Sequence, residues 1–202
     1  MKIMKPIVGI AAALALVATP LTAAYAADDT TKGSAIRLGA DLDQIDTLNP
    51  FTSIFDVALN VLSYQYYPLA GIDESGDYGG LLADDFSAEG NVWTYHIRDN
   101  AKWSDGEPVV ADDVVWTYES VKNSKDMQVA NGESVGNIEK VTAVDDKTVT
   151  FETNAPTALH PGILPIVPKH IWEKLDDPAT YENTEDVVGS GPFVISDYKR
   201  GT

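Results

Sequence analysis

One stretch of the sequence, from Trp93 to Tyr118, places strand, turn and helix signals directly after one another. Its first part alternates apolar with polar residues, as a strand with one buried face does, at Trp93, Tyr95 and Ile97. Ser104-Asp105-Gly106 then supplies turn-forming residues. Apolar residues next recur at helical spacing, at Val110, Val114, Tyr118 and Val121. Asp112 and Asp113 lie in the first turn, where the helix dipole favours negative charge, so the stretch predicts a strand–turn–helix unit.

The turn and the helix share a run of spaced residues: Trp103, Asp105, Gly106, Pro108, Ala111, Asp113 and Val114. This run resembles the W-x-D-G-x-P-x-x-A-x-D-V signature of the family 5 solute-binding proteins, the oligopeptide- and dipeptide-binding components of bacterial ABC importers. Further landmarks follow the family's order: Asn49-Pro50, Leu82-Ala83-Asp84, the segment Asp145–Phe151, Val167-Pro168-Lys169-His170 and Val188–Phe193. The resemblance covers essentially all of the chain after its N-terminal leader.

Residues 1–26 have the layout of a secretory signal peptide. Lys2 and Lys5 precede an apolar run at 7–17, and Ala24-Tyr25-Ala26 is a cleavage motif. We expect 27–34 to be a flexible leader. A retained membrane anchor is the weaker alternative, because no basic stop-transfer flank follows. The sequence has no cysteine and therefore no lipobox, which favours a periplasmic or freely secreted protein.

The composition limits the classes of partner and ligand that we expect the protein to bind. There are 14 basic and 31 acidic side chains, a formal charge of −17, so binding to the phosphates of nucleic acid is disfavoured. Acidic residues within 73–85, 112–119 and 173–186 are typical of solvated faces. The absence of cysteine excludes disulfides and thiolate sites, and the three histidines, His96, His160 and His170, lack metal-ligand spacing. We expect neither a metal nor a cofactor.

Local patterns predict the remaining elements. We expect a strand at Ala35–Ala40, a helix after Ser53 capped by a Ser53/Asp56 capping box, and loops at 71–76 and 123–136. The segments 141–144 and 148–151 predict an antiparallel hairpin. A short helix over 171–175 and a final strand over Phe193–Tyr198 complete the pattern.

The family resemblance implies an α/β fold, a two-lobe clamshell of the type II periplasmic-binding-protein kind. Family members continue into a second lobe and then return to the first. Residues 35–202 are therefore expected to be the N-terminal part of the solute-binding domain: a first lobe, with an inserted subdomain, that is incomplete.

Binding sites of this family hold the ligand through main-chain hydrogen bonds, which sequence identifies poorly. The resemblance places Thr52, Ser53, Ile54 and Phe55 at the edge that touches ligand, and Met127 in a second cleft-facing stretch, 126–132. Simpler interpretations stay open, because Ser53 could cap a helix, Phe55 could pack, and Met127 could lie in an exposed loop. Trp103 is expected to be structural.

The resemblance implies capture of a solute outside the cytoplasm and its delivery to the permease subunits of an ABC importer. Hinge closure would be the mechanism, and the protein would be a monomer without enzymatic activity. Peptides are the first expectation, but oligosaccharides, nickel complexes and opines are also ligands in the family. Two alternatives stay open: a secreted serine hydrolase using the S-x-x-K motif at Ser196, and a ligand-sensing receptor of the same fold. That motif must open a helix, whereas its surroundings predict a strand.

Overall fold

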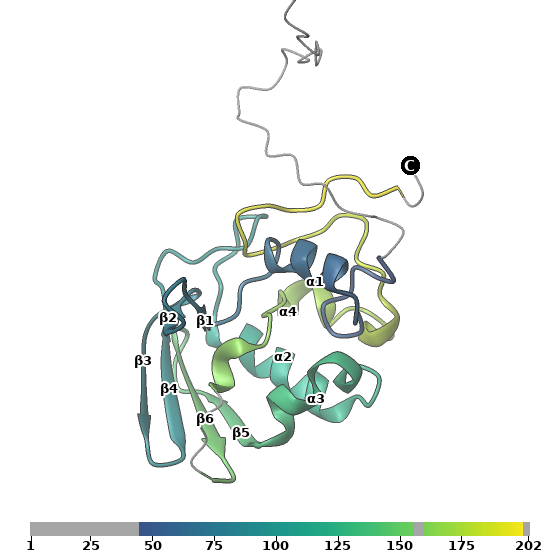
Figure 1. The fold of residues 1–202 in the computed structure, drawn as a ribbon. Helices are drawn as coiled ribbons and strands as arrows, with labels where there is room; N and C mark the ends of the chain where they lie inside the picture. Colours follow the sequence, from purple (N-terminus) through teal and green to yellow (C-terminus); the bar gives the residue numbers. More distant parts are fainter. Residues whose placement is uncertain (1–44, 156–159, 200–202) are drawn as a thin grey trace, which may run out of the picture. The chain divides into compact units, whose positions relative to one another are not determined.

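A computed structural model describes residues 45–155 and 160–199 (Figure 1). The chain divides into two units, 1–38 and 39–202, and the described residues belong to the second. The expected signal peptide, the leader at 27–34 and the strand at Ala35–Ala40 lie outside the described residues.

An antiparallel four-stranded sheet with the order β3-β4-β6-β5 forms one layer of this unit. Its strands are β3 (Ala83–Glu89), β4 (Val92–Ile97), β5 (Ile138–Ala143) and β6 (Thr148–Thr153). The strand around Tyr95 and the β5–β6 hairpin are thus confirmed. Asp145 closes that hairpin, because its carboxylate accepts the Lys147 and Thr148 N–H groups at 2.8 and 2.7 Å. Strand β3 shows no alternation of apolar residues, because its side chains are mostly exposed.

Helix α2 (Ala111–Asn123) packs against β5 and β6. Val114, Tyr118 and Val121 are buried, which confirms the expected apolar stripe. The rings of Tyr118 and Phe151 meet edge to face with centroids 4.8 Å apart. The strand–turn–helix unit therefore supplies both layers of the core.

The expectation of a loop over 123–136 is wrong, because α3 (Gln128–Gly136) occupies most of it. Its glycines disfavour a helix, but burial of Val135 and Met127 outweighs that preference. The Gln128 amide also donates to Val121 O and Lys122 O, at 3.1 and 2.7 Å, and so caps the end of α2. Tertiary contacts thus decide the conformation here.

Two further expectations require correction near the start of the described chain. The region 71–76 is not only a loop, because β1 (Ala70–Ile72) pairs with β2 (Tyr78–Gly80) across a turn closed by Asp73. The Ser53/Asp56 capping box is wrong, since α1 (Asp56–Ser63) begins after Phe55 and has no side-chain cap. The Ser53 hydroxyl instead donates a hydrogen bond to Asp46, which precedes the helix.

Short helical turns connect the rest: η2 (Pro161–Ile163), α4 (Lys169–Trp172) and η3 (Pro178–Thr180). A short helix was expected over 171–175, and the structure has one in this region, but it begins earlier, at Lys169, and ends at Trp172. Trp172 of α4 is buried and meets the Phe51 ring edge to face at 5.4 Å. These segments join the region of α1 to the sheet layer.

The final segment, Phe193–Tyr198, is not a strand. Its backbone donates to Tyr64 O, from Phe193 N at 3.2 Å, and to the Gln65 side chain, from Ile195 N at 3.4 Å. A strand needs a continuous ladder with a neighbour, and the described residues provide none beside it. In Figure 1 this yellow segment runs past α1, away from the sheet.

Candidate functional site

The signature residues build a corner of the scaffold in which Trp103, Ala111, Asp113 and Val114 are buried, while the turn residues are exposed. Trp103 Nε1 donates to Asp113 Oδ2 at 3.1 Å, and the backbone N–H groups of Val110 and Lys169 also donate to this carboxylate, both at 2.9 Å. Asp113 is almost fully buried, so the expectation of a solvated acidic face over 112–119 is wrong at this position. Burial raises the pKa of Asp113, although the three donors oppose that effect.

The same carboxylate replaces the helix cap that the sequence lacks. A valine side chain cannot accept a hydrogen bond, so Val110 leaves half of a capping box empty. The other half is present, because Asp113 accepts the Val110 N–H. Gly106 turns the chain with a positive φ of 97°, which favours glycine. The corner is thus structural, as expected for Trp103.

The edge after Pro50 is fixed from behind by Asn49. Its side-chain oxygen accepts the Phe51 N–H at 3.0 Å, and its amide donates to Pro178 O and Tyr181 O, both at 2.9 Å. Asn49 is fully buried, so these bonds lie in a low-dielectric environment. The start of the edge is therefore pinned to η3 and the residue after it.

Asp46 fixes the other end of this edge. Ser53 Oγ donates to Asp46 Oδ1 at 2.7 Å, and Ile54 N donates to Oδ2 at 3.2 Å. Burial raises the pKa of Asp46, but these hydrogen bonds outweigh it and the net pKa is below the usual value. Ser53 is buried and bonded inward, and Thr52 is half-buried.

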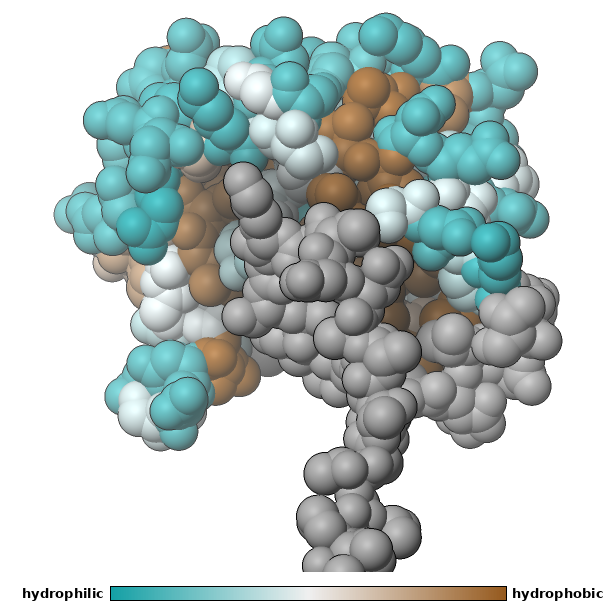
Figure 2. All heavy atoms as spheres, turned by 90° about the horizontal axis from the view of Figure 1, so that it is seen from above, coloured by the Kyte–Doolittle hydropathy of each residue, from teal (hydrophilic) through white to brown (hydrophobic). Residues whose placement is uncertain are grey.

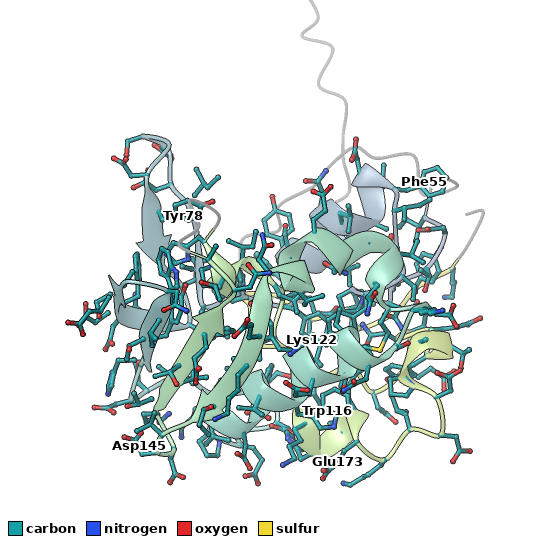
Figure 3. All side chains as sticks on the ribbon, turned by 90° about the horizontal axis from the view of Figure 1, so that it is seen from below. Phe55, Tyr78, Trp116, Lys122, Asp145 and Glu173 are labelled. Atoms are coloured by element: carbon teal, nitrogen blue, oxygen red, sulfur yellow. The ribbon has the colours of Figure 1, made fainter. Side chains whose placement is uncertain are left out.

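Ile54 and Phe55 point outward from the pinned edge, with exposed fractions of 59 % and 48 %. Other apolar side chains are exposed nearby and extend what we call the α1 surface: Leu59, Tyr64, Phe193 and Val194. The Tyr64 and Phe193 rings meet edge to face at 6.2 Å. Figure 3 shows Phe55 at the outer side of α1, and Figure 2 shows apolar atoms on the face seen from above.

Met127 lies in the interior, with an exposed fraction of 1 %. The stretch 126–132 does reach the edge, but through Asn131, whose amide donates to Pro50 O and Phe51 O at 3.3 and 3.4 Å. Sequence reasoning missed Asn131, because nothing in its surroundings marked a helix. It also missed Asp46, and it identified Asn49 only as a landmark, because the bonds of Asn49 to Pro178 and Tyr181 join residues distant in sequence.

A glycine-rich strap, residues 189–191, connects the α1 region to the signature turn. The N–H groups of Ser190 and Gly191 both donate to Gln65 O, at 2.9 and 2.8 Å. Gly189 exchanges two hydrogen bonds with Ser104. A Cβ on Gly191 would lie 2.1 Å from Tyr64 O, so only glycine fits there.

The described residues offer little for catalysis or metal binding. Ser196 lies in a segment without helix, so the S-x-x-K motif lacks the setting that its chemistry requires. Within 45–155 and 160–199, no cluster of three His, Asp or Glu side chains is placed to hold a metal ion. No helix in this part of the chain is long and apolar enough to cross a membrane.

Comparison with known proteins agrees with this arrangement. The chain is 31 % identical over 195 residues to the peptidoglycan-binding protein YepA of Agrobacterium fabrum, an alignment covering 88 % of this chain and 31 % of YepA. The oligopeptide-binding protein AppA of Bacillus subtilis, solved with a nonapeptide, superposes with a TM-score of 0.68 at 26 % identity, covering 80 % of this chain and 34 % of AppA. NikZ of Campylobacter jejuni, solved with Ni(L-His), gives a TM-score of 0.68 at 25 % identity, covering 78 % and 32 %.

The chain spans about a third of the length of these relatives. Its fold is accordingly part of a type II periplasmic-binding-protein fold. Residues 77–202, more than half of the chain, match the family described as "Bacterial extracellular solute-binding proteins, family 5 Middle". The chain therefore belongs to the family 5 bacterial extracellular solute-binding proteins.

Proposed function

We propose that the chain forms part of a protein that binds a solute outside the cytoplasm, most simply a peptide, and delivers it to the permease subunits of an ABC importer. The observation that carries this proposal is the edge Thr52–Phe55, which is pinned by Asp46 and Asn49 while Ile54 and Phe55 face outward. A rigid edge loses little conformational entropy when a ligand binds to it.

The edge suits an extended ligand. The backbone N–H groups of Thr52, Ser53 and Ile54 are bonded to Asn49 and Asp46, so the exposed side chains of Ile54 and Phe55 would provide the contact area for a peptide. We assign Thr52, Ser53, Ile54 and Phe55 to this edge. Met127 supports α3 from the interior, while Asn131 holds the edge from the α3 side. Hinge closure over the ligand, which the family resemblance implies, is the proposed mechanism.

Ligand class is open within the family, since the relatives were named for, or solved with, peptidoglycan, a nonapeptide and Ni(L-His). Peptide is favoured because the edge presents the apolar side chains of Ile54 and Phe55 to solvent and because the relatives include a protein solved with a nonapeptide. We further propose removal of residues 1–26 on export, a periplasmic or secreted location, and a monomer. No observation in the structure favours the hydrolase.

A thermal-shift screen of the complete polypeptide tests the proposal. The panel contains di- to nonapeptides, muropeptides, oligosaccharides and nickel–histidine chelates. A ligand at 100 times its Kd stabilises by about 2.7 kcal/mol, which a melting curve resolves. Phe55→Ala should reduce the shift, whereas Ile72→Ala, a similarly exposed residue on β1, should not. A polypeptide whose melting temperature responds to no class on the panel would exclude the proposal.

A further inference from the structure

His160 is buried among aromatic rings on the sheet, with an exposed fraction of 3 %. Its ring stacks on Tyr78 of β2 with centroids 4.4 Å apart. It meets Phe86 of β3 at 4.6 Å and Trp93 of β4 at 4.7 Å, both close to edge to face. Three strands therefore contribute to one aromatic box, and Figure 3 shows Tyr78 beside the sheet.

The hydrogen bonds of the box fix where the imidazole proton lies. Tyr95 Oη is 2.8 Å from His160 Nδ1 and also accepts the Gly162 N–H at 3.1 Å. If the Tyr95 hydroxyl donates to Nδ1, only the Nε2–H group of the box stays unpaired. If Nδ1 carries the proton instead, both the hydroxyl hydrogen and Nε2 lack partners. The first arrangement leaves fewer buried groups unsatisfied, so the neutral His160 ring carries its proton on Nε2.

His160 Nε2 is completely enclosed and has no hydrogen-bond partner. A second proton would make the ring a cation. Its Nε2–H would still have no acceptor, and its new Nδ1–H would take the place of the hydrogen that the Tyr95 hydroxyl donates. Desolvation of a charge is costly, and burial accordingly lowers the pKa of His160 below its ordinary value. Attraction of a cation to the surrounding ring faces opposes this effect.

The neighbouring ionisable groups do not compensate a charge on His160. Tyr95 and Tyr118 are neutral, since burial raises the pKa of both, and Tyr78 offers its ring face. A pocket of about 110 Å³ borders His160, and Glu133 of α3, at its exposed side, is the one carboxylate among its lining residues. An imidazolium that left the box could approach Glu133.

We propose that His160 is a proton-operated catch: the neutral ring closes the box over Phe86, Trp93 and Tyr95, and uptake of one proton releases it together with η2. Release would open the pocket beside α3, because His160, Pro161 and Ile163 form one of its walls. Tyr118 would retain part of the connection, since its hydroxyl donates to Pro161 O.

Urea unfolding of the chain at pH values from 7.5 to 5 tests the catch. Because the folded state resists the second proton, stability is lost as the pH falls below about 6.5 toward the folded-state pKa. One proton raises the unfolding equilibrium constant by up to about tenfold per pH unit in that window. His160→Phe, which keeps a ring but cannot be protonated, should remove this increase.

His96 provides the matched control. Its hydrogen bond with Asp84 at 3.0 Å raises its pKa, so its contribution to stability is present at low pH and lost as the pH rises. His96→Gln should therefore remove a pH dependence that lies above pH 6.5 and leave the loss of stability below pH 6.5 in place, whereas His160→Phe should remove that loss. Equal pH profiles for the wild type and His160→Phe would refute the catch.

Imidazole NMR of the wild type gives a decision even if His160→Phe does not fold. The catch requires the Nε2–H form at pH 7.5 and a titration midpoint below 6.5 for His160. A midpoint at or above 6.5 would mean that the rings stabilise the cation, and the proposal would be rejected. His160→Asn, which keeps an acceptor near the Nδ1 position, is a second variant that should lack the pH-dependent loss.

Discussion

The signature corner around Trp103 and the edge after Pro50 are both fixed by side-chain hydrogen bonds, but the centre of the corner is buried, whereas the edge presents apolar side chains to solvent. In the corner, the buried Asp113 carboxylate accepts three hydrogen bonds, and the neighbouring Trp103 is buried as well. At the edge, Asp46 and Asn49 bond inward while Ile54 and Phe55 face outward. The recognisable residues thus build the scaffold, and less distinctive residues present a surface.

We expect the largest loss of stability from a substitution that removes the hydrogen bonds of the corner. Asp113→Ala leaves Trp103 Nε1 and the N–H groups of Val110 and Lys169 buried without an acceptor. Each unsatisfied donor costs about 1–3 kcal/mol, so we expect a loss of about 3–5 kcal/mol in the free energy of unfolding, measured with urea. Asp112→Ala is the control, because its exposed ion pair with Lys169 is worth less than about 1 kcal/mol. Equal losses for the two variants would contradict the assignment.

The next largest loss of stability is expected from a substitution in the strap, residues 189–191, that connects the two regions. Gly191→Ala puts a Cβ 2.1 Å from Tyr64 O, so the backbone must move, at a cost of about 1–3 kcal/mol. Gly132→Ala in α3 meets nothing closer than the Gln128 Cβ at 3.7 Å and should gain about 0.5–1 kcal/mol through helix propensity. Thermal unfolding of both variants checks the opposite signs, and destabilisation by Gly132→Ala would count against the described α3.

We expect a smaller loss of stability from a substitution that weakens the hydrogen bonds of the edge. Asp46→Asn keeps an acceptor for Ser53 but loses the one for the Ile54 N–H, and solvent exposure limits the expected loss to about 1 kcal/mol. Because the pKa of Asp46 is lowered in the fold, its stabilisation is present above pH 3.8 and disappears as the pH falls through the folded-state value. Unfolding curves between pH 5 and 3 should therefore be less pH-dependent in Asp46→Asn than in the wild type.

The smallest effect on stability belongs to the α1 surface. Ile54→Ser should change the free energy of unfolding by less than about 0.5 kcal/mol, because the side chain is already exposed. It should still weaken ligand binding by the complete polypeptide, measured by calorimetry with a peptide that the thermal-shift screen identifies. Val144→Ser, with an exposed fraction of 61 % near the hairpin turn, should change neither quantity. A stability loss above 1 kcal/mol would show that Ile54 packs instead of facing outward.

Sequence patterns predicted the elements whose own residues carry a strong period. The strand around Tyr95, helix α2 and the β5–β6 hairpin are examples, because alternation and helical spacing directly reflect burial. They failed where distant contacts decide. Helix α3 depends on burial of Val135, and Phe193–Tyr198 lacks a neighbouring strand among the described residues.

The sequence predicted less of the candidate site than of the fold. The positions Thr52–Phe55 followed from family order, but the side chains that fix them were not predicted: Asn49 served only as a landmark, and Asp46 and Asn131 belong to no motif. Asp113 was expected in solvent, because an acidic residue in a first helical turn usually serves the dipole. Its burial follows from Trp103 and Lys169, which sequence spacing alone does not bring together.

The strand order also has a consequence for synthesis on the ribosome. Strand β4 pairs with β6, for example Trp93 with Phe151, and 50 residues separate Ile97 from Thr148. At about 5–20 residues per second, β4 waits about 3–10 s for this partner while its hairpin with β3 already exists. During that interval the nascent chain carries an open strand edge lined with aromatic residues, the kind of edge that recruits other chains. Folding yield should therefore depend on how well that edge is shielded before β6 emerges.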